Sequence, residues 1–455
     1  MSAQVKRSDS AGPPRAVGEG PGMPFHDPDG AHYLTYPDPV DFVAGGGPAA
    51  LTEALAERSA AAPLALHVQS PGSPPACRAT DRHKAEPYLS RLDREMVLVS
   101  RLFQQPPPPV QRLHWGGDVA AGLSLGQMGD LFDRLDARFG LSGARERDFS
   151  VEISPREADV FTLRHLQALG FNRLSLGVQE LDLRVQKAIG RVQPRVLTES
   201  LVDEAERLGF HSLNLDLVVG LPLQTPASFA ETLDQVMAMA PARITLHRYA
   251  RLPPHSRPRR AVRAEDLPDA ATRLAILDNG REQLIGAGYV PIGLDHFARP
   301  GDSLALALGE GRLARDLQGY TPHPRCDQIG LGVAAISRVG DTCVRNVESL
   351  ADYAAALDAS RLACAGGIRL GSADRLRRDA IEALACRREL DLAALSRAHG
   401  RDATRVLADA LARLKPLCRG GLLERHGECL SVTPDGVRHL AHLLAAFAPG
   451  GTSLS

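Results

Sequence analysis

Carboxylates, amides and paired glycines recur in this chain at the ends of short apolar segments. Carboxylates suit ammonium groups and hydroxyls as partners, and an arginine suits a carboxylate. Singly, each has an ordinary alternative role, because Glu152 or Asp216 could simply cap the helix that follows it. Together they indicate one binding site, since polar residues recur at the same end of nearly every predicted strand. The residues concerned are His114, Gly116, Gly117, Glu152, Gln179, Asn214, Asp216, Tyr249, Ala250, Asp295 and His296.

The first strand-like segment, residues 64–68, leads into a loop that contains two proline-rich turns and a glycine. In a parallel α/β barrel the loops that follow the strands build the active site. We therefore expect this loop to hold chemically informative residues. It holds a lone cysteine, Cys77, between Ser73 and Thr80.

The elements that must position these residues alternate between period-2 and helical spacing of apolar side chains. Strands are predicted over residues 64–68, 110–115, 149–153, 173–178, 213–219, 244–249 and 289–294. Helices are predicted over residues 51–58, 84–103, 125–139, 156–169, 197–208, 226–239 and 270–286. Six or seven strand-then-helix units predict an α/β fold, with a parallel sheet wound into a full or partial barrel.

Three regions are predicted along the chain. Residues 1–46 form an N-terminal extension, and the first ~30 residues, rich in Gly, Pro and Ser, are expected to be disordered. Residues 47–369 form the barrel and its extension, and residues 370–455 form a small helical C-terminal domain with a winged-helix-like order of elements. We favour a helical cap on the barrel over DNA binding, because the chain carries almost no net charge.

Composition narrows the functional classes. The formal net charge of −1 gives no electrostatic reason to expect nucleic acid or an anionic membrane as a partner. The seven cysteines are scattered without a C-x-x-C pair, so neither a zinc knuckle nor a disulfide framework is indicated. No signal-peptide core or membrane-spanning apolar run is recognisable. We expect a cytoplasmic monomer.

Several of these segments, taken in order, resemble the oxygen-independent coproporphyrinogen III oxidases, a family of radical S-adenosylmethionine enzymes in haem biosynthesis. The resemblance spans roughly residues 30 to 440. It implies a partial (βα)6 parallel barrel of radical-SAM type with a helical C-terminal domain over its mouth. It also implies oxidative decarboxylation of two propionates of coproporphyrinogen III, giving protoporphyrinogen IX, with S-adenosylmethionine and a 4Fe-4S cluster as cofactors. The matching segments are residues 33–37, 114–117, 172–179, 214–222, 295–300, 318–321 and 329–337.

Carried over position by position, the resemblance assigns a set of residues to S-adenosylmethionine. Four of them supply polar contacts, two supply contacts from later loops, the paired glycines allow the ligand to approach the backbone, and His67 stands in the place of a family tyrosine on the first strand. The set is His67, Gly116, Gly117, Glu152, Gln179, Arg191, Asp216, Ala250 and Ile336.

Three departures from the family pattern concern the same end of the barrel. The motif C-x-x-x-C-x-x-C reads Ser73, Cys77 and Thr80, and His67 stands where the family has tyrosine. Residues 118–120 read Asp-Val-Ala where the family has Gly-Thr-Pro. Iron–sulfur clusters need thiolates, and a hydroxyl is a poor ligand because it keeps its proton at neutral pH. Cys77 alone will not hold a cluster, unless distant cysteines such as Cys326 or Cys343 approach it in space.

Two main interpretations follow. The chain is a working coproporphyrinogen dehydrogenase, or it is a non-catalytic relative that binds haem, a porphyrin or a nucleoside in a regulatory or carrier role. We favour the second, because reductive cleavage of S-adenosylmethionine requires an electron delivered through a cluster. Nothing in the sequence argues for a third possibility, a different enzyme without radical chemistry. Candidate haem ligands are His67, His114 and His296, although histidines at such positions are more often hydrogen-bonded pocket residues.

Overall fold

The computed structural model describes residues 36–38, 41–59, 62–70, 85–106, 109–116, 119–141, 143, 147–249, 262–323 and 326–448. Within these residues the largest sheet has thirteen strands in the order β1-β15-β14-β13-β12-β2-β3-β4-β5-β6-β7-β9-β8. The strands from β12 to β7 run parallel in this order, and the strands on either side of them are antiparallel. The parallel strands are β2 (Leu64–Gln69), β3 (Arg112–Gly116), β4 (Asp148–Ile153), β5 (Arg173–Gln179), β6 (Ser212–Val219), β7 (Arg243–Arg248) and β12 (Asp327–Leu331).

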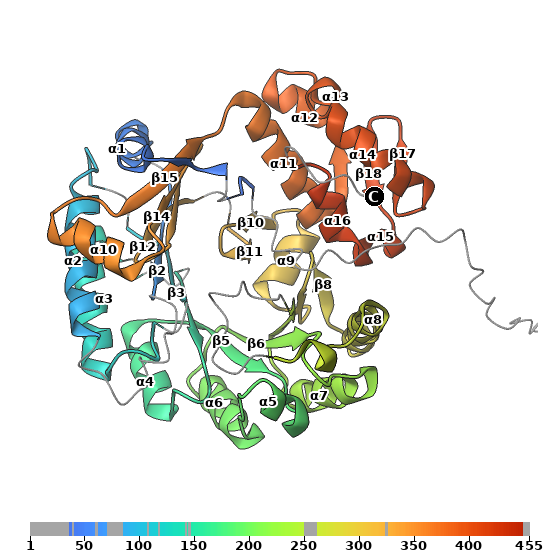
Figure 1. Cartoon of the computed structure of the whole chain (residues 1–455), viewed down its shortest axis with the longest axis horizontal. Helices are drawn as coiled ribbons and strands as arrows, with labels where there is room; N and C mark the ends of the chain where they lie inside the picture. Colours follow the sequence, from blue (N-terminus) through green and yellow to red (C-terminus); the bar gives the residue numbers. More distant parts are fainter. Residues whose placement is uncertain are drawn as a thin grey trace, which may run out of the picture.

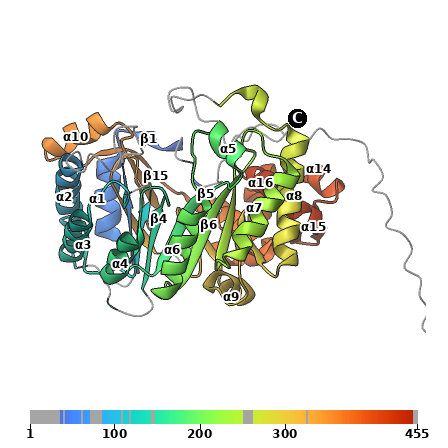
Figure 2. The same cartoon turned by 90° about the horizontal axis from the view of Figure 1, so that it is seen from below.

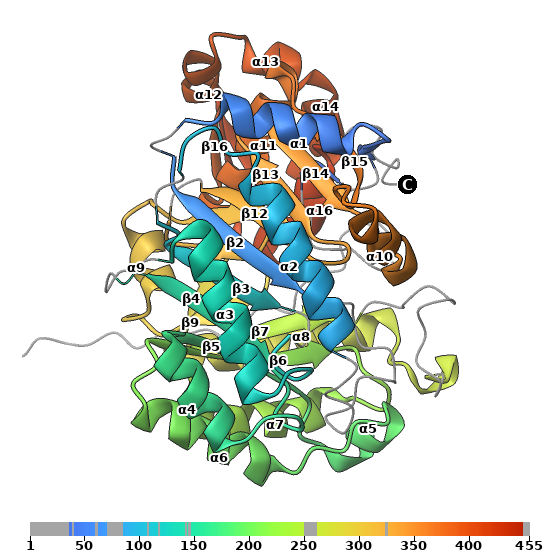
Figure 3. The same ribbon diagram turned by 90° about the vertical axis from the view of Figure 1, so that its left-hand side faces the viewer.

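Helices cover the outer, convex side of the curved sheet (Figure 1). Each of the strands β2 to β7 is followed by at least one of them, which confirms the predicted partial (βα)6 barrel. Figure 3 shows α2 and α3 side by side against β2 and β3, and Figure 2 shows α6 and α7 over β5 and β6. The barrel helices are α2 (Glu86–Ser100), α3 (Leu125–Phe139), α4 (Val160–Leu169), α5 (Leu183–Ala188), α6 (Arg195–Arg207), α7 (Pro226–Ala238) and α8 (Ala270–Gly286).

Helix α3 illustrates why these segments are helical. Ser124 and Gln127 form a capping box, in which the serine side chain accepts from the Gln127 N–H and the glutamine side chain accepts from the Ser124 N–H. Met128, Leu131 and Leu135 then bury one stripe of the helix against the sheet. Both α3 and α8 have the bounds that the sequence predicts.

The segment predicted as a seventh parallel strand is instead a hairpin. Strands β8 (Val290–Ile292) and β9 (His296–Ala298) pair antiparallel, and β9 also pairs antiparallel with β7. Gly293 turns the chain with a φ of +57°, and the Tyr320 ring occupies the space that a side chain at this position would need. A three-residue connection permits only an antiparallel neighbour, because a parallel strand needs a long crossover. The prediction of a strand ending at Leu294 was therefore wrong.

The sequence after Pro300 contains more regular structure than its irregular pattern indicates. A hairpin of two short strands, β10 and β11, lies inside the curve of the sheet (Figure 1). Strand β12 pairs in parallel with β2, with Ile329 opposite Leu66. The other elements in this part and at the N-terminal edge are β1 (Val43–Ala44), α1 (Gly47–Glu57), η4 (Ala264–Asp266), α9 (Ser303–Gly309), β10 (Ala314–Asp316), β11 (Gly319–Thr321), β13 (Ile336–Val339), β14 (Thr342–Asn346), α10 (Leu350–Asp358) and β15 (Cys364–Arg369).

The C-terminal elements form a helical module with a three-stranded antiparallel sheet, in the order β16-β18-β17. Its elements are α11 (Ser372–Arg387), β16 (Glu389–Asp391), α12 (Leu392–His399), α13 (Ala403–Val406), α14 (Ala408–Arg419), β17 (Leu423–His426), β18 (Cys429–Val432), α15 (Pro434–Arg438) and α16 (Leu440–Ala445). This agrees with the helix, helix, ribbon, helix order read from the sequence. The division at residues 369 and 370 into two domains stays a prediction.

The module packs beside the barrel, next to β8 and α8, and not over the mouth as the resemblance implies (Figure 1). A second hydrophobic cluster joins Ile292 and Leu304 of the barrel side to Leu376, Leu414 and Phe447 of the module. Without the module, the apolar side chains of β8 and α9 would be exposed to water, which explains why the module packs here. Among the described residues, no helix has the length and apolar composition required to cross a membrane.

Candidate functional site

The barrel encloses a cavity of about 710 Å³, lined by β2 to β7, β9, β12 and the β10–β11 hairpin. Its walls are polar because polar residues alternate with apolar ones along each strand. On β5, Arg173, Ser175 and Gln179 line the cavity, while Leu176 and Val178 are buried. Most small parallel barrels fill this space with branched apolar side chains. A polar interior of this size is therefore suited to a polar ligand.

Four residues predicted to bind a ligand meet in this cavity. Glu152, Gln179, Arg191 and Asp216 all line it, at or near the mouth, which is the end where β2 to β7 finish. The predicted convergence of Glu152, Gln179 and Asp216 is thus what the structure shows. Their predicted role in binding a cofactor stays a proposal.

Gln179 and Arg191 are fixed by the backbone around them. Gln179 ends β5 with a φ of +68°, in the left-handed region that residues other than glycine seldom adopt, and the strand pairing shifts register beside it. The Arg191 Nη2 donates to Ser154 Oγ at 3.0 Å and to the Gly177 carbonyl at 2.9 Å. The guanidinium is thereby held against the end of β5, on the cavity wall.

Asp216 accepts three hydrogen bonds from neighbouring side chains. Ser175 Oγ donates to Oδ2 at 2.5 Å, Asn214 Nδ2 donates to Oδ1 at 2.8 Å, and His247 Nε2 lies 3.0 Å from the same Oδ1. Burial opposes a charge on His247, but the hydrogen bond to Asp216 and the charges of Asp216, Asp295 and Glu152 outweigh it and raise the pKa of this histidine. The wall formed by β6 and β7 therefore carries an acid and a base in contact.

His67 and His114 are direct partners across β2 and β3, and only His114 lines the cavity. His114 Nδ1 lies 2.8 Å from Ser150 Oγ. His67 Nδ1 lies 2.7 Å from Gln318 Nε2, and burial, followed by the charge of His114, lowers the pKa of His67 to about 3. His67 is therefore a neutral, hydrogen-bonded residue on the same face of the sheet as His114, beside the cavity and bonded to Gln318.

Gly116 makes room for these two histidines. A Cβ at this position would lie 3.1 Å from the Nε2 atoms of both His67 and His114. A side chain here would have to displace both rings by a few tenths of an ångström, so a glycine suits the packing whether or not a ligand also approaches. Gly116 is not among the cavity-lining residues, and Ile336, at the start of β13, is not among them either.

Other predicted site residues lie outside the described residues. They are Gly117, Ala250 and the three motif positions Ser73, Cys77 and Thr80. Cys326 directly precedes β12, whose first residue is opposite Leu64, so it lies at the floor of the barrel, where the strands begin. Cys343 lies at a similar level, because it pairs with Arg338, which pairs with Gln328. Neither approaches Gln69, where the motif loop starts.

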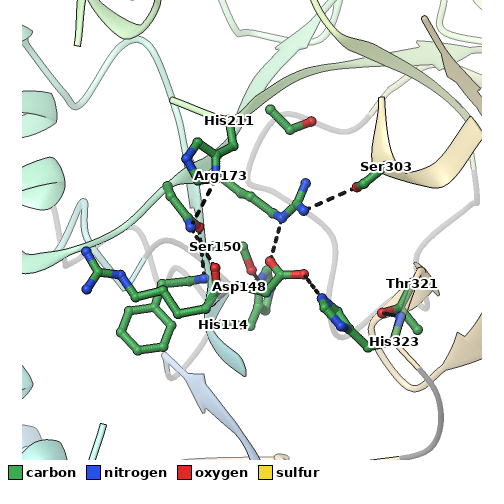
Figure 4. A network of polar contacts seen from close by, with 12 residues as sticks. His114, Asp148, Ser150, Arg173, His211, Ser303, Thr321 and His323 are labelled. Atoms are coloured by element: carbon green, nitrogen blue, oxygen red, sulfur yellow. Dashed lines mark hydrogen bonds and ion pairs between the residues drawn. The ribbon is translucent and has the colours of Figure 1, made fainter. Parts of the chain in front are cut away.

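A network of charged side chains closes the floor of the cavity (Figure 4). Asp148 on β4 contacts Arg173 Nε at 2.7 Å and His323 Nε2 at 3.3 Å. Arg112 on β3 contacts Asp316 of the β10–β11 hairpin at 2.6 Å. Burial opposes the charge of Asp148, but the hydrogen bond from His323 and the charges of Arg173 and Arg112 hold its pKa well below the ordinary value. The hairpin is thus tied to the strands by ion pairs.

Sequence reasoning missed His247, Ser175 and the floor arginines. The signal was present in the period-2 alternation, for example in Arg243-Ile244-Thr245-Leu246-His247. Most of the candidate residues named from the sequence lie at strand ends; apart from Asn214 and Asp216 on β6, the inward-facing positions further along the strands were not identified. No group of three His, Cys, Asp or Glu side chains within the described ranges is arranged to hold a metal ion.

The chain is similar to known proteins over nearly its whole length. A family model described as "HemN C-terminal domain" matches residues 370–439. The oxygen-independent coproporphyrinogen III oxidase of Pseudomonas aeruginosa is 40% identical over 436 residues, which cover 93% of this chain and 95% of that protein. The protein of the same name from Escherichia coli is 37% identical over 426 residues, covering 92% of each.

A solved structure agrees with these sequence matches. It is the structure of coproporphyrinogen III oxidase (HemN) from Escherichia coli, a radical SAM enzyme. It superposes with a TM-score of 0.87 at 35% identity, covering 92% of this chain and 97% of that one. The barrel and the C-terminal module are therefore both shared with that structure.

Proposed function

Because this chain belongs to the oxygen-independent coproporphyrinogen III oxidase family, we propose that it keeps the family's nucleoside-binding cavity but does not assemble the iron–sulfur cluster. In this proposal it binds S-adenosylmethionine or the related S-adenosylhomocysteine and performs no radical chemistry. A tetrapyrrole such as coproporphyrinogen III or haem is the second ligand, in a regulatory or carrier role. The observation that carries the proposal is the meeting of Glu152, Gln179, Arg191 and Asp216 on one cavity of about 710 Å³.

The residues on the cavity wall fit the chemistry of the nucleoside. Its amino-acid end carries an ammonium and a carboxylate, and its ribose carries two hydroxyls. Glu152 suits the ammonium, Arg191 suits the carboxylate, and the oxygens of Asp216 suit the hydroxyls. In the radical superfamily, a cluster and S-adenosylmethionine together supply the initiating radical.

The donor set for the cluster does not fit. The three positions that the family fills with thiolates hold a serine, Cys77 and a threonine. A hydroxyl remains protonated at neutral pH and is a weak ligand for iron of this type. Cys326 and Cys343 lie at the barrel floor, so neither of these two supplies a substitute ligand near Gln69. Because only one of the three thiolates that the family uses is present, we propose nucleoside binding without radical catalysis.

The alternative is a working coproporphyrinogen dehydrogenase, favoured by the 40% identity to the Pseudomonas relative along almost the whole chain. One experiment separates the two. The protein is reconstituted anaerobically with iron and sulfide, its bound iron is counted, and its binding of S-adenosylhomocysteine is measured by calorimetry. Nucleoside binding without stoichiometric iron, and without cleavage of S-adenosylmethionine, supports the proposal. About four bound irons together with conversion of coproporphyrinogen would establish the enzyme instead.

A further inference from the structure

His247 places an ionisable cation on the wall of the proposed nucleoside cavity. It lies on β7 and lines the cavity together with Glu152, Arg191 and Asp216. Its Nε2 is 3.0 Å from Asp216 Oδ1, and its side chain is one-third exposed, toward the cavity. A protonated His247 therefore faces whatever the cavity holds.

The groups that face His247 are mostly acidic. From β6 it meets Asp216, and from the turn between β8 and β9 it is influenced by Asp295, whose Oδ1 lies 2.6 Å from His296 Nδ1. Glu152 acts on it from β4 across the cavity. Burial opposes the charge on His247, but this acidic surrounding outweighs it and raises the pKa, so the imidazolium persists to a higher pH than in an exposed histidine.

The charge state of His247 changes the net charge near the mouth by one unit. Glu152 and Asp216 are two carboxylates, and Arg191 is a permanent cation. With His247 protonated these four groups sum to zero, and with His247 neutral they sum to −1; Asp295 adds one further negative charge in both states. The two candidate nucleosides differ in the same quantity, because the sulfonium of S-adenosylmethionine gives it one more positive charge than the thioether S-adenosylhomocysteine.

We propose that His247 makes the cavity select its nucleoside by charge, favouring the neutral thioether when the imidazole is protonated and admitting the sulfonium when it is not. This inference rests on the proposed function, since it concerns the same cavity. A sphere of 710 Å³ is about 11 Å across, so a charge anywhere inside lies within range of His247. At such distances, one unit of charge in a partly screened interior changes an affinity ratio by about tenfold.

His247→Gln is the discriminating variant, because an amide keeps a donor for Asp216 and cannot be protonated. The dissociation constants of S-adenosylmethionine and S-adenosylhomocysteine are measured by calorimetry on the full-length protein at pH 6 and pH 9. Titration of the ligands' own amino groups affects both proteins equally and cancels in the comparison. At pH 6 the variant should shift the ratio of the two constants about tenfold toward S-adenosylmethionine. At pH 9 the variant and the unaltered protein should give the same ratio.

His426→Gln, at an exposed histidine on β17 of the C-terminal module, is the matched control and should leave the ratio unchanged at both pH values. If both nucleosides bind but His247→Gln does not alter their ratio at pH 6, the inference is overturned while the proposed function stands. If neither nucleoside binds at any pH, the proposed function fails and the inference fails with it. Should the glutamine variant not fold, His247→Asn removes the same charge with a shorter donor and is judged by the same ratio.

Discussion

The carboxylate of Asp148 lies 2.7 Å from the guanidinium of Arg173 and joins neighbouring strands β4 and β5 at the barrel floor. The two side chains are only 11% and 16% exposed, so water screens the pair weakly. Removing one member of such a pair leaves the other charge buried without compensation. The floor should therefore be sensitive to single neutral substitutions.

We expect Asp148→Asn to destabilise the protein by about 3 kcal/mol at pH 7. The measurement is the shift of the urea unfolding midpoint. Because the pKa of Asp148 is depressed in the folded state, its stabilisation is present above the ordinary aspartate pKa of 3.8 and is lost as the pH falls below it. Asp130→Asn, at an exposed position of α3, is the control and should change stability by less than about 0.5 kcal/mol. An equal effect of both substitutions would show that the floor ion pair contributes nothing.

Glu95 should make the protein less stable as the pH rises. It is a buried carboxyl on α2 that accepts from Gly332 N–H, Asn346 Nδ2 and Tyr353 O–H, at 2.7, 2.5 and 2.6 Å. Burial raises its pKa from 4.5 to about 7, against the effect of these donors. The folded state therefore holds the proton more tightly, and stability is lost as the pH rises from about 4.5 to 7.

Glu95→Gln should be close to the unaltered protein at pH 5 and more stable at pH 8, by on the order of 3 kcal/mol. Urea unfolding at the two pH values measures this difference. Glu86→Gln, at an exposed carboxylate on the same helix, is the control and should show no such dependence. A Glu95 variant that is less stable than the unaltered protein at pH 8 would show that the charged form is the favoured one.

Arg191→Gln should weaken binding of S-adenosylhomocysteine by about 10- to 100-fold, because a charge-assisted pair with the nucleoside carboxylate is lost. Calorimetry at pH 7 measures the change. Arg184→Gln, at an exposed arginine on α5, provides the comparison and should bind as the unaltered protein does. Unchanged affinity in the Arg191 variant would remove this residue from the proposed site.

Reconstitution with iron and sulfide should leave the unaltered protein without iron–sulfur absorption in the visible range. The double variant Ser73→Cys/Thr80→Cys restores the ligand spacing of the family without lengthening the chain. It should gain partial iron binding and little turnover, because Pro74 and Pro75 restrict the loop and His67 still differs from the family. The single variant Ser73→Cys is the control and should bind less iron than the double variant. Full loading of the unaltered protein would contradict the ligand count.

Much of the fold was predictable because local patterns were strong. Helices such as 125–139 and 270–286 begin after a capping residue, Ser124 and Asp269, and their bounds were predicted without error. The hairpin of β8 and β9 was missed because two strands of three residues give too little periodicity to separate them. The pairing of β12 with β2 joins segments far apart in the chain, which no local pattern encodes.

The site was predictable in part for a similar reason. Glu152, Gln179 and Asp216 lie at or near strand ends, and parallel strands bring such positions to one edge of the sheet. His247 and Ser175 were not found, because their importance comes from contacts across strands, as in the hydrogen bonds of both to Asp216. Pairing of this kind depends on register, which becomes visible only in the folded sheet.

The hydrophobic core shared by the barrel and the C-terminal module can be completed only late in synthesis, because its residues lie far apart in the sequence. Leu304, fully buried in that core, leaves the ribosome about 140 residues before its neighbour Phe447. At translation rates of 5–20 residues per second, roughly 7 to 30 seconds pass between synthesis of β8 and α9 and synthesis of the C-terminal residues that bury their apolar side. The nascent chain therefore exposes an apolar surface, to which chaperones can bind, until α16 and Phe447 have emerged.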